Sequence, residues 1–181
     1  MIVKEILECA LLFDGIKEVG NNEGFEKRFF KKYNMTFQEL MVTVGWKRGQ
    51  AWCAYLSELI WKLAYLQFDV SIVYQLEKLF SGSAVQTYMN FKDSKDFVCS
   101  NVPVKGAVVI WVLYKNGKVT NSGHAGIVIS VTDTVIETIE GNTNKSGSRE
   151  GDQVAKKTKI VDFSLKENGL NLLGFIHPKK V

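Results

Sequence analysis

The stretch GAVVIWVLYKNGKVTNSGHAGIVISVTDTVIETIEGNT, residues 106–143, decides the fold class because it contains three β-rich runs in close succession. Valine, isoleucine and threonine are frequent in these runs, and Gly, Asn, Asp and Ser separate them. The tetrapeptide KNGK at 115–118 is typical of a hairpin turn. Two further β-rich runs follow at 154–163 and 170–178. We therefore predict a mostly antiparallel sheet over about 103–178.

The preceding part of the chain, about 1–95, is patterned as helices. Apolar residues recur at helical spacing, and Thr36 followed by Glu39 three positions later forms a capping-box pattern. The predicted helices lie at the amino terminus and at 25–33, 36–45, 52–67, 71–80 and 83–91. Helices before strands, without β–α–β alternation, predict an α+β fold with N-terminal helices packed on the sheet. No repeat or domain boundary is visible, so we expect one domain over 1–181.

Composition narrows the function classes. The chain has 23 Lys and Arg against 19 Asp and Glu, a formal charge of +4. These charges are spread along the chain rather than gathered in a dense basic block, so no nucleic-acid partner is expected. No apolar run approaches the length of a membrane span. The first twenty residues are interrupted by Glu5, Glu8 and Asp14 and lack a small-residue cleavage site, unlike a signal peptide.

The chain has three cysteines, Cys9, Cys53 and Cys99, and two histidines, His124 and His177. An odd number of cysteines leaves at least one thiol unpaired, and this usage is typical of a reducing compartment. No CxxC pair or Cys/His cluster occurs. We therefore expect no protein metal centre and no cofactor.

Cys53 stands at the start of a predicted helix, within RGQAWCAYLSEL at 48–59. The positive end of the helix dipole lowers a thiol pKa, and unpaired amides of the first turn can donate to an oxyanion. A cysteine at this position is therefore suited to nucleophilic acyl transfer. The alternative, which this stretch alone favours somewhat, is a buried small hydrophobic residue.

A cysteine nucleophile needs a base, and His124 is the candidate. His177 lies four residues from the end, where fraying and a structural role are expected. The β-run after His124 closes with Glu140, Gly141 and Asn142. Strand alternation places Glu140 and Asn142 on one face, from which the carboxylate can orient a histidine on the neighbouring strand. The alternatives are a structural histidine and an ordinary hairpin with a solvated glutamate.

The helix-start cysteine, the Gly-His pair and the Glu-Gly-Asn triplet, in that order, resemble the cysteine, histidine-dependent amidohydrolase/peptidase (CHAP) family. That family belongs to the NlpC-like group of papain-like cell-wall hydrolases. The segments that carry the resemblance are EVGNNEG, WCAYLSEL, PVKGAVVIW, GHAGIV, IEGNTN and GFIHP, within roughly residues 10–178. The resemblance implies a papain-like variant of the α+β fold.

The resemblance also implies roles for the candidate residues. Cys53 would attack an amide carbonyl of peptidoglycan, and His124 would accept the thiol proton and later protonate the leaving amine. Glu140 would orient His124, and Asn142 would lie alongside as a secondary polar contact. Water would then release the acyl-enzyme.

Two further positions are candidates for substrate or oxyanion contacts. Gln50 and the backbone amide of Cys53 would meet the oxyanion, although many members of the family carry the glutamine directly before the cysteine. Trp52, adjacent to the nucleophile, could line a groove for the glycan or peptide stem. The alternative for Trp52 is core packing.

We therefore expect a peptidoglycan hydrolase, either an amidase or an endopeptidase, of the phage-lysin or virion-associated type. Peptidoglycan is the expected substrate, and a phage virion or an export machine is the candidate partner. The protein would be made in the cytoplasm without a signal peptide and act at the cell wall or periplasm after lysis, injection or dedicated export. Two alternatives remain: an exported bacterial effector amidase or transacylase, and a non-catalytic phage structural or binding module.

Overall fold

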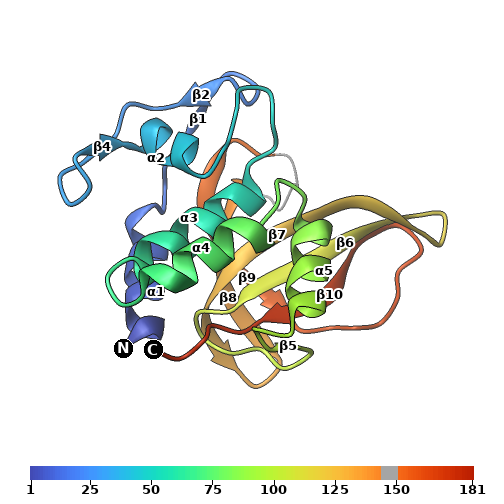
Figure 1. Ribbon diagram of the computed structural model, residues 1–181. Coiled ribbons are helices and arrows are strands. Elements are labelled where there is room, and N and C mark those ends of the chain that lie inside the picture. Colours follow the sequence, from blue (N-terminus) through green and yellow to red (C-terminus); the bar gives the residue numbers. More distant parts are fainter. Residues whose placement is uncertain (144–150) are drawn as a thin grey trace.

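A six-stranded antiparallel sheet forms one layer of the computed structural model, which describes residues 1–143 and 151–181 (Figure 1). The strands are β5 (Cys99–Ser100), β6 (Val108–Lys115), β7 (Lys118–Thr132), β8 (Val135–Thr143), β9 (Gln153–Ile160) and β10 (Gly169–Ile176). Their order across the sheet is β5-β10-β6-β7-β8-β9. Asn144, the last residue of the IEGNTN motif, lies outside the described residues.

Helices form the second layer and cover one face of this sheet (Figure 1). The helices are α1 (Ile2–Leu12), α2 (Phe37–Thr43), α3 (Cys53–Tyr65), α4 (Val70–Leu79) and α5 (Ala84–Ser94). Helices α1, α3 and α5 contact the sheet, whereas α2 and α4 pack against α3. Helix α3 packs against α1 and against β7 and β8, while α5 packs against β6 and β7. The predicted α+β class, with N-terminal helices on an antiparallel sheet, is confirmed.

Two local sequence patterns, a capping box and a hairpin turn, form the structures that they predict. Helix α2 begins with the capping box, in which the Thr36 hydroxyl accepts from the Glu39 amide and the Glu39 carboxylate accepts from the Thr36 amide. The KNGK turn joins β6 to β7, with Lys115 paired to Lys118. Its two central residues have positive φ angles of 50° and 69°, as a tight hairpin turn requires.

The predicted helix over 25–33 is wrong. This segment belongs to two short hairpins, formed by β1 (Glu18–Val19) with β2 (Gly24–Phe25) and by β3 (Phe29–Phe30) with β4 (Met35–Thr36). Phe25 and Phe30 are buried while Phe29 is 53% exposed. The ring of Phe25 lies 4.7 Å from that of Phe37. Packing with residues distant in the sequence therefore outweighs the local helical spacing.

The two faces of the sheet carry different residues. Along β7, Ala125 and Ile127 belong to the core beneath the helices, whereas Val128 belongs to a smaller apolar cluster on the other face. Alternation places His124 on the same face as Val128. Trp111, which is paired with His124 across β6 and β7, is also in the smaller cluster.

The two ends of the chain lie near each other (Figure 1). The hydroxyl of Tyr65, the last residue of α3, donates to the backbone oxygen of Lys179 at 2.8 Å. Gly106 lies against both Pro178 and Val3, which brings the carboxyl-terminal tail next to α1. None of the helices in the described ranges has the length and apolarity needed to cross a bilayer.

Candidate active site

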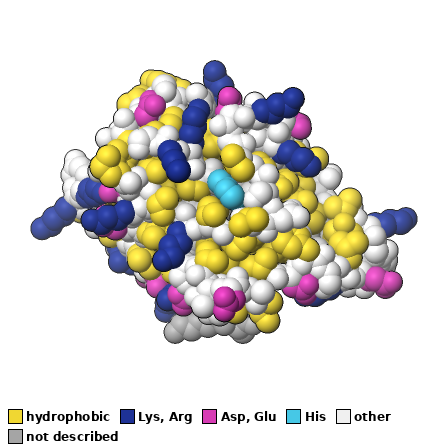
Figure 2. All heavy atoms as spheres, turned by 90° about the horizontal axis from the view of Figure 1, so that it is seen from below, with side chains coloured by type: hydrophobic (Ala, Val, Ile, Leu, Met, Phe, Trp, Pro, Cys, Tyr) yellow, Lys and Arg dark blue, Asp and Glu magenta, His cyan; other side chains and the backbone are white. Residues whose placement is uncertain are grey.

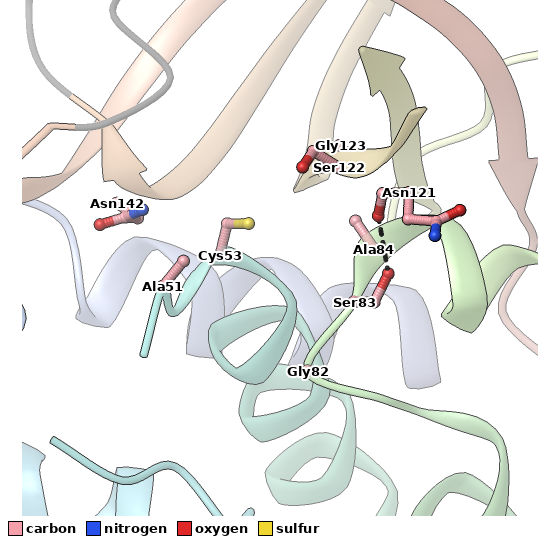
Figure 3. A pocket seen from close by; sticks show the side chains of 9 residues that line it. All are labelled: Ala51, Cys53, Gly82, Ser83, Ala84, Asn121, Ser122, Gly123 and Asn142. Carbon is pink, nitrogen blue, oxygen red and sulfur yellow. Dashed lines mark hydrogen bonds between the residues drawn. The ribbon is translucent and has the colours of Figure 1, made fainter. Parts of the chain in front are cut away.

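Cys53 is the first residue of α3 and opens onto a pocket of about 260 Å³. Apart from Cys53, the described residues that line the pocket are small or polar and uncharged. The lining residues are Ala51, Cys53, Gly82, Ser83, Ala84, Asn121, Ser122, Gly123 and Asn142 (Figure 3). Figure 3 shows Cys53 between Asn142 on one side and the start of α5 with the 121–123 segment on the other. The Ser83 hydroxyl donates to the backbone oxygen of Asn121 at 3.4 Å and joins those two walls.

The surroundings of Cys53 favour its thiolate form. Burial raises the pKa of the thiol, but the neighbouring imidazole of His124 and the backbone amides of Ala125 and Ala54 outweigh burial and hold the pKa below its usual range. Because Cys53 begins α3, the positive end of the helix dipole acts in the same direction. Cys53 is therefore a buried thiol with the electrostatic character of a nucleophile.

His124 is buried on β7, with 1% of its surface exposed. Its Nε2 atom lies 2.9 Å from Glu140 Oε2. Burial lowers the pKa of the imidazole, but Cys53 and Glu140 outweigh this effect and raise the pKa to about 9. The other ring nitrogen, Nδ1, has no well-formed hydrogen bond to the described residues, while Cys53 raises the imidazole pKa through its charge and its side-chain contact with the ring. Nδ1 is thus the nitrogen left to exchange a proton with the thiol.

Glu140 is also 1% exposed, and both of its carboxylate oxygens have partners. Oε2 faces His124, and Oε1 accepts a hydrogen bond from the Thr138 hydroxyl at 2.6 Å. Burial raises the pKa of the carboxyl, but His124, Lys159 and Thr138 hold it below its usual range. A buried carboxylate with this many partners stays ionised and can hold an imidazolium in place.

Gly126 explains how Glu140 reaches His124. Gly126 is the cross-strand partner of Glu140, and a Cβ atom at this position would lie 2.7 Å from Glu140 Cγ and 3.1 Å from the Ile139 oxygen. The missing side chain therefore leaves the space that the carboxylate occupies. Gly126 thus allows the close approach of Glu140 to the histidine.

Asn142 lies at the pocket that Cys53 also lines. The register of β8 and β9 shifts between Glu140 and Thr143, and Asn142 has a left-handed φ of 53°. This irregularity interrupts the alternation that would place Glu140 and Asn142 on the same face. Asn142 lines the pocket with Cys53, and no hydrogen bond joins Asn142 to His124.

Trp52 lies in the core, which is the second of the two alternatives that the sequence leaves open. It is fully buried, its ring lies 5.0 Å from that of Phe25, and its Nε1 donates to Glu18 at 2.7 Å. A Cβ atom on Gly141 would lie 2.5 Å from the Trp52 ring. Trp52 therefore packs directly against β8. The expectation of a substrate contact at Trp52 is therefore wrong, because its surface is used within the protein.

Gln50 lies in the loop before α3 and is outside the pocket lining. Its side-chain oxygen accepts from the Tyr55 hydroxyl at 3.1 Å and from the Lys47 amide at 3.0 Å. The Tyr55 hydroxyl lies close to Gly82, one of the pocket residues. The structure thus connects Gln50 to the pocket wall through Tyr55 and does not bring it to Cys53.

His177 lies apart from the site, at the end of β10. Its Nε2 atom lies 3.0 Å from the Ser100 hydroxyl and 2.9 Å from the Val102 oxygen. These contacts fit a structural role for His177. Figure 2 shows the molecule from below, where hydrophobic side chains lie exposed among Lys and Arg side chains.

Sequence reasoning missed several residues of the site. Lys159 lies 3.5 Å from Glu140, and Ser83 and Asn121 form a wall of the pocket. The small polar runs SGSA at 81–84 and NSG at 121–123 are the sequence signal for that wall, because such residues leave space beside a nucleophile. Lys159 has no comparable signal, since its contact depends on how β9 pairs with β8.

Among the residues that the structure describes, no group of three or more His, Cys, Asp or Glu side chains could hold a metal ion. Comparison with protein-family models, with curated proteins and with solved structures finds no match to this chain. Function must therefore be inferred from the chemistry of the Cys53 pocket.

Proposed function

We propose that this protein is a cysteine hydrolase that cleaves an amide bond of peptidoglycan, as an amidase or endopeptidase. The observation that carries the proposal is the array of Cys53, His124 and Glu140 beside an open pocket. The thiol pKa is lowered and the imidazole pKa is raised, so the pair favours the thiolate–imidazolium form. The resemblance of the sequence to the CHAP family supplies the substrate class.

Acylation begins when Cys53 Sγ attacks the carbonyl carbon of the scissile amide. The carbonyl electron pair moves to oxygen, and the resulting oxyanion is met by the amide of Cys53, which has no acceptor within its own helix. The tetrahedral intermediate then collapses, and the C–N bond breaks as the imidazolium of His124 protonates the leaving amine. The acyl group remains on sulfur as a thioester.

In deacylation His124 acts as a base, whereas in acylation it acts as an acid. The neutral imidazole of His124 takes a proton from water, whose oxygen attacks the thioester carbonyl. The C–S bond breaks, the carboxylate product leaves, and the thiolate–imidazolium pair is restored. Glu140 holds the imidazole through Nε2 in both half-reactions.

Among the described residues, no Lys, Arg, Asp or Glu lines the pocket, so this part of its wall suits a small, uncharged group next to the scissile bond. The net charge of +4 suits association with an anionic wall. In this proposal the protein acts at the cell wall or periplasm after lysis, injection or export, and the phage-lysin type is preferred.

The test is mass spectrometry of purified peptidoglycan digested with the wild type, with Cys53→Ala and with Cys99→Ala. Hydrolysis yields a new amine and a new carboxylate, and the mass identifies the bond. Cys53→Ala should lose activity by on the order of 10⁴ or more, while Cys99→Ala should keep it. An exchanged amide would indicate a transacylase, and digestion by Cys53→Ala would disprove the assignment.

A further inference from the structure

Lys159 on β9 contacts the candidate site from the face of the sheet opposite the helices. Its Nζ atom lies 3.5 Å from Glu140 Oε2 and 4.9 Å from the centre of the Trp111 ring. The Trp111 ring in turn lies 5.9 Å from that of His124, with an interplanar angle of 33°. The ammonium group is therefore held between a buried carboxylate and an aromatic face, both next to the imidazole.

The register of β8 and β9 explains this placement. Ile136 pairs with Lys159, and Thr138 pairs with Lys157, so both lysines share a face with Glu140. Both lysines therefore act on the carboxylate, and Lys159 forms an ion pair with it at 3.5 Å.

The groups that face Glu140 come from three strands. They are His124 from β7, the Thr138 hydroxyl from β8, and Lys157 and Lys159 from β9. Lys156 is on the other face, where it pairs with Glu137 at 2.8 Å. Lys159 is 28% exposed and Glu140 is 1% exposed, so solvent screens this pair only in part.

We propose that Lys159 is a positioning residue, which keeps Glu140 ionised and thereby fixes the tautomer of His124. This inference rests on the proposed roles of Cys53 and His124. During turnover the imidazole is neutral whenever its proton is on the leaving amine. At that stage Lys159 remains as a cation in contact with the buried carboxylate.

The tautomer decides whether His124 can act as a base. With Glu140 ionised, the neutral ring carries its proton on Nε2, which donates a hydrogen bond to the carboxylate. The lone pair on Nδ1 is then free to accept the proton of the thiol. With Glu140 protonated, its O–H donates to Nε2 and the neutral ring carries its proton on Nδ1. That form cannot accept the proton of Cys53, so the nucleophile is not activated.

The first test measures the rate of iodoacetamide labelling at Cys53 against pH, by mass spectrometry of the labelled peptide. Lys159→Gln should move the midpoint upward by roughly one pH unit, while Lys159→Arg should restore a midpoint close to that of the wild type. Lys156→Gln is the control on the other face, and Lys157→Gln removes an equal charge nearby. An unchanged midpoint in Lys159→Gln, or an equal shift in Lys157→Gln, would overturn the proposal.

The second test reads the tautomer directly from the ¹⁵N chemical shifts of His124 in a Cys53→Ala background. At a pH at which the ring is neutral, its proton should be on Nε2 when Lys159 is present, and the Nδ1 form should appear when Lys159 is replaced. Lys159→Met, which keeps the aliphatic chain over Trp111, is used if the Gln variant does not fold. An Nε2–H ring in every folded variant would reject the proposal. Neither test uses peptidoglycan, so a failed wall assay and a failed positioning role give different results.

Discussion

Cys9 and Cys53 are both buried on helices, but their surroundings differ. Cys9 lies within α1, with 1% of its surface exposed, and burial raises its pKa. Cys53 is 6% exposed at the first position of α3, and its pKa is lowered. The Tyr33 hydroxyl at 3.5 Å and the charge of Lys32 both lower the pKa of Cys9, but burial and the carboxylate of Glu5 outweigh them.

The comparison shows that neighbouring groups, and not burial, separate a structural thiol from a candidate nucleophile. At Cys53 an imidazole, two backbone amides and a helix N-terminus oppose the cost of burying a thiolate. At Cys9 a phenol hydroxyl and the charge of Lys32 act in the same direction, but burial and the carboxylate of Glu5 outweigh them. Four predictions test this difference.

The largest expected effect is in thiol labelling. At neutral pH, iodoacetamide should label Cys53 roughly a hundredfold faster than Cys9 or Cys99, because the labelled species is the thiolate. Cys99 is the informative control, since it is more exposed than Cys53 but burial raises its pKa to about 11. Rates come from mass spectrometry of tryptic peptides. Faster labelling of Cys99 would mean that access, and not ionisation, controls reactivity.

Gly126→Ala should lower the reactivity of Cys53 toward that of Cys9. The added methyl would lie 2.7 Å from Glu140 Cγ and displace the carboxylate from His124. Labelling of Cys53 should slow about tenfold, and the free energy of unfolding should fall by roughly 1–3 kcal/mol. Gly24→Ala is the matched control, because its Cβ would meet only the flexible end of Gln38. Equal behaviour of the two variants would show that the Glu140 contact does not matter.

The pH dependence of hydrolysis should reflect the raised pKa of His124. Its protonated form donates to the leaving amine, and that form is lost as pH rises through about 9. The rate should therefore halve near pH 9 and decline further above it. In the acid limb of the profile, the rate should rise with pH around a midpoint below the usual thiol pKa, because the pKa of Cys53 is lowered. A profile of kcat/KM against pH checks both limbs, and a decline near pH 6.5 would exclude the proposed pair.

Cys9→Ala should have the smallest effect. Loss of the buried sulfur should lower the free energy of unfolding by about 1 kcal/mol, measured by urea denaturation. The labelling rate of Cys53 and the hydrolysis rate should not change. A loss of activity with the fold intact would place Cys9 in the functional machinery.

The fold class could be predicted from sequence because its signals are local. Alternation and turn residues mark the strands after residue 103, and helical spacing marks α3, α4 and α5. The segment 25–33 could not be predicted in this way, because Phe25 and Phe30 are buried through contacts with distant aromatic residues.

Some contacts of the candidate site could likewise be predicted from the sequence and others could not. The His124–Glu140 contact agrees with the expected pairing of neighbouring strands. The position of Asn142 does not, since a register shift after Glu140 is a property of how two strands pair. Lys159 could not be found for the same reason, as its contact depends on the pairing of β8 with β9.

The position of the chain ends relative to α3 has a practical consequence. Cys53 and Tyr65 lie at opposite ends of this helix, about 18 Å apart at 1.5 Å per residue. The carboxyl-terminal tail is attached at the Tyr65 end, next to the amino-terminal helix. A tether to a solid support or a fused wall-binding module, joined at either terminus, would therefore leave the mouth of the pocket unobstructed.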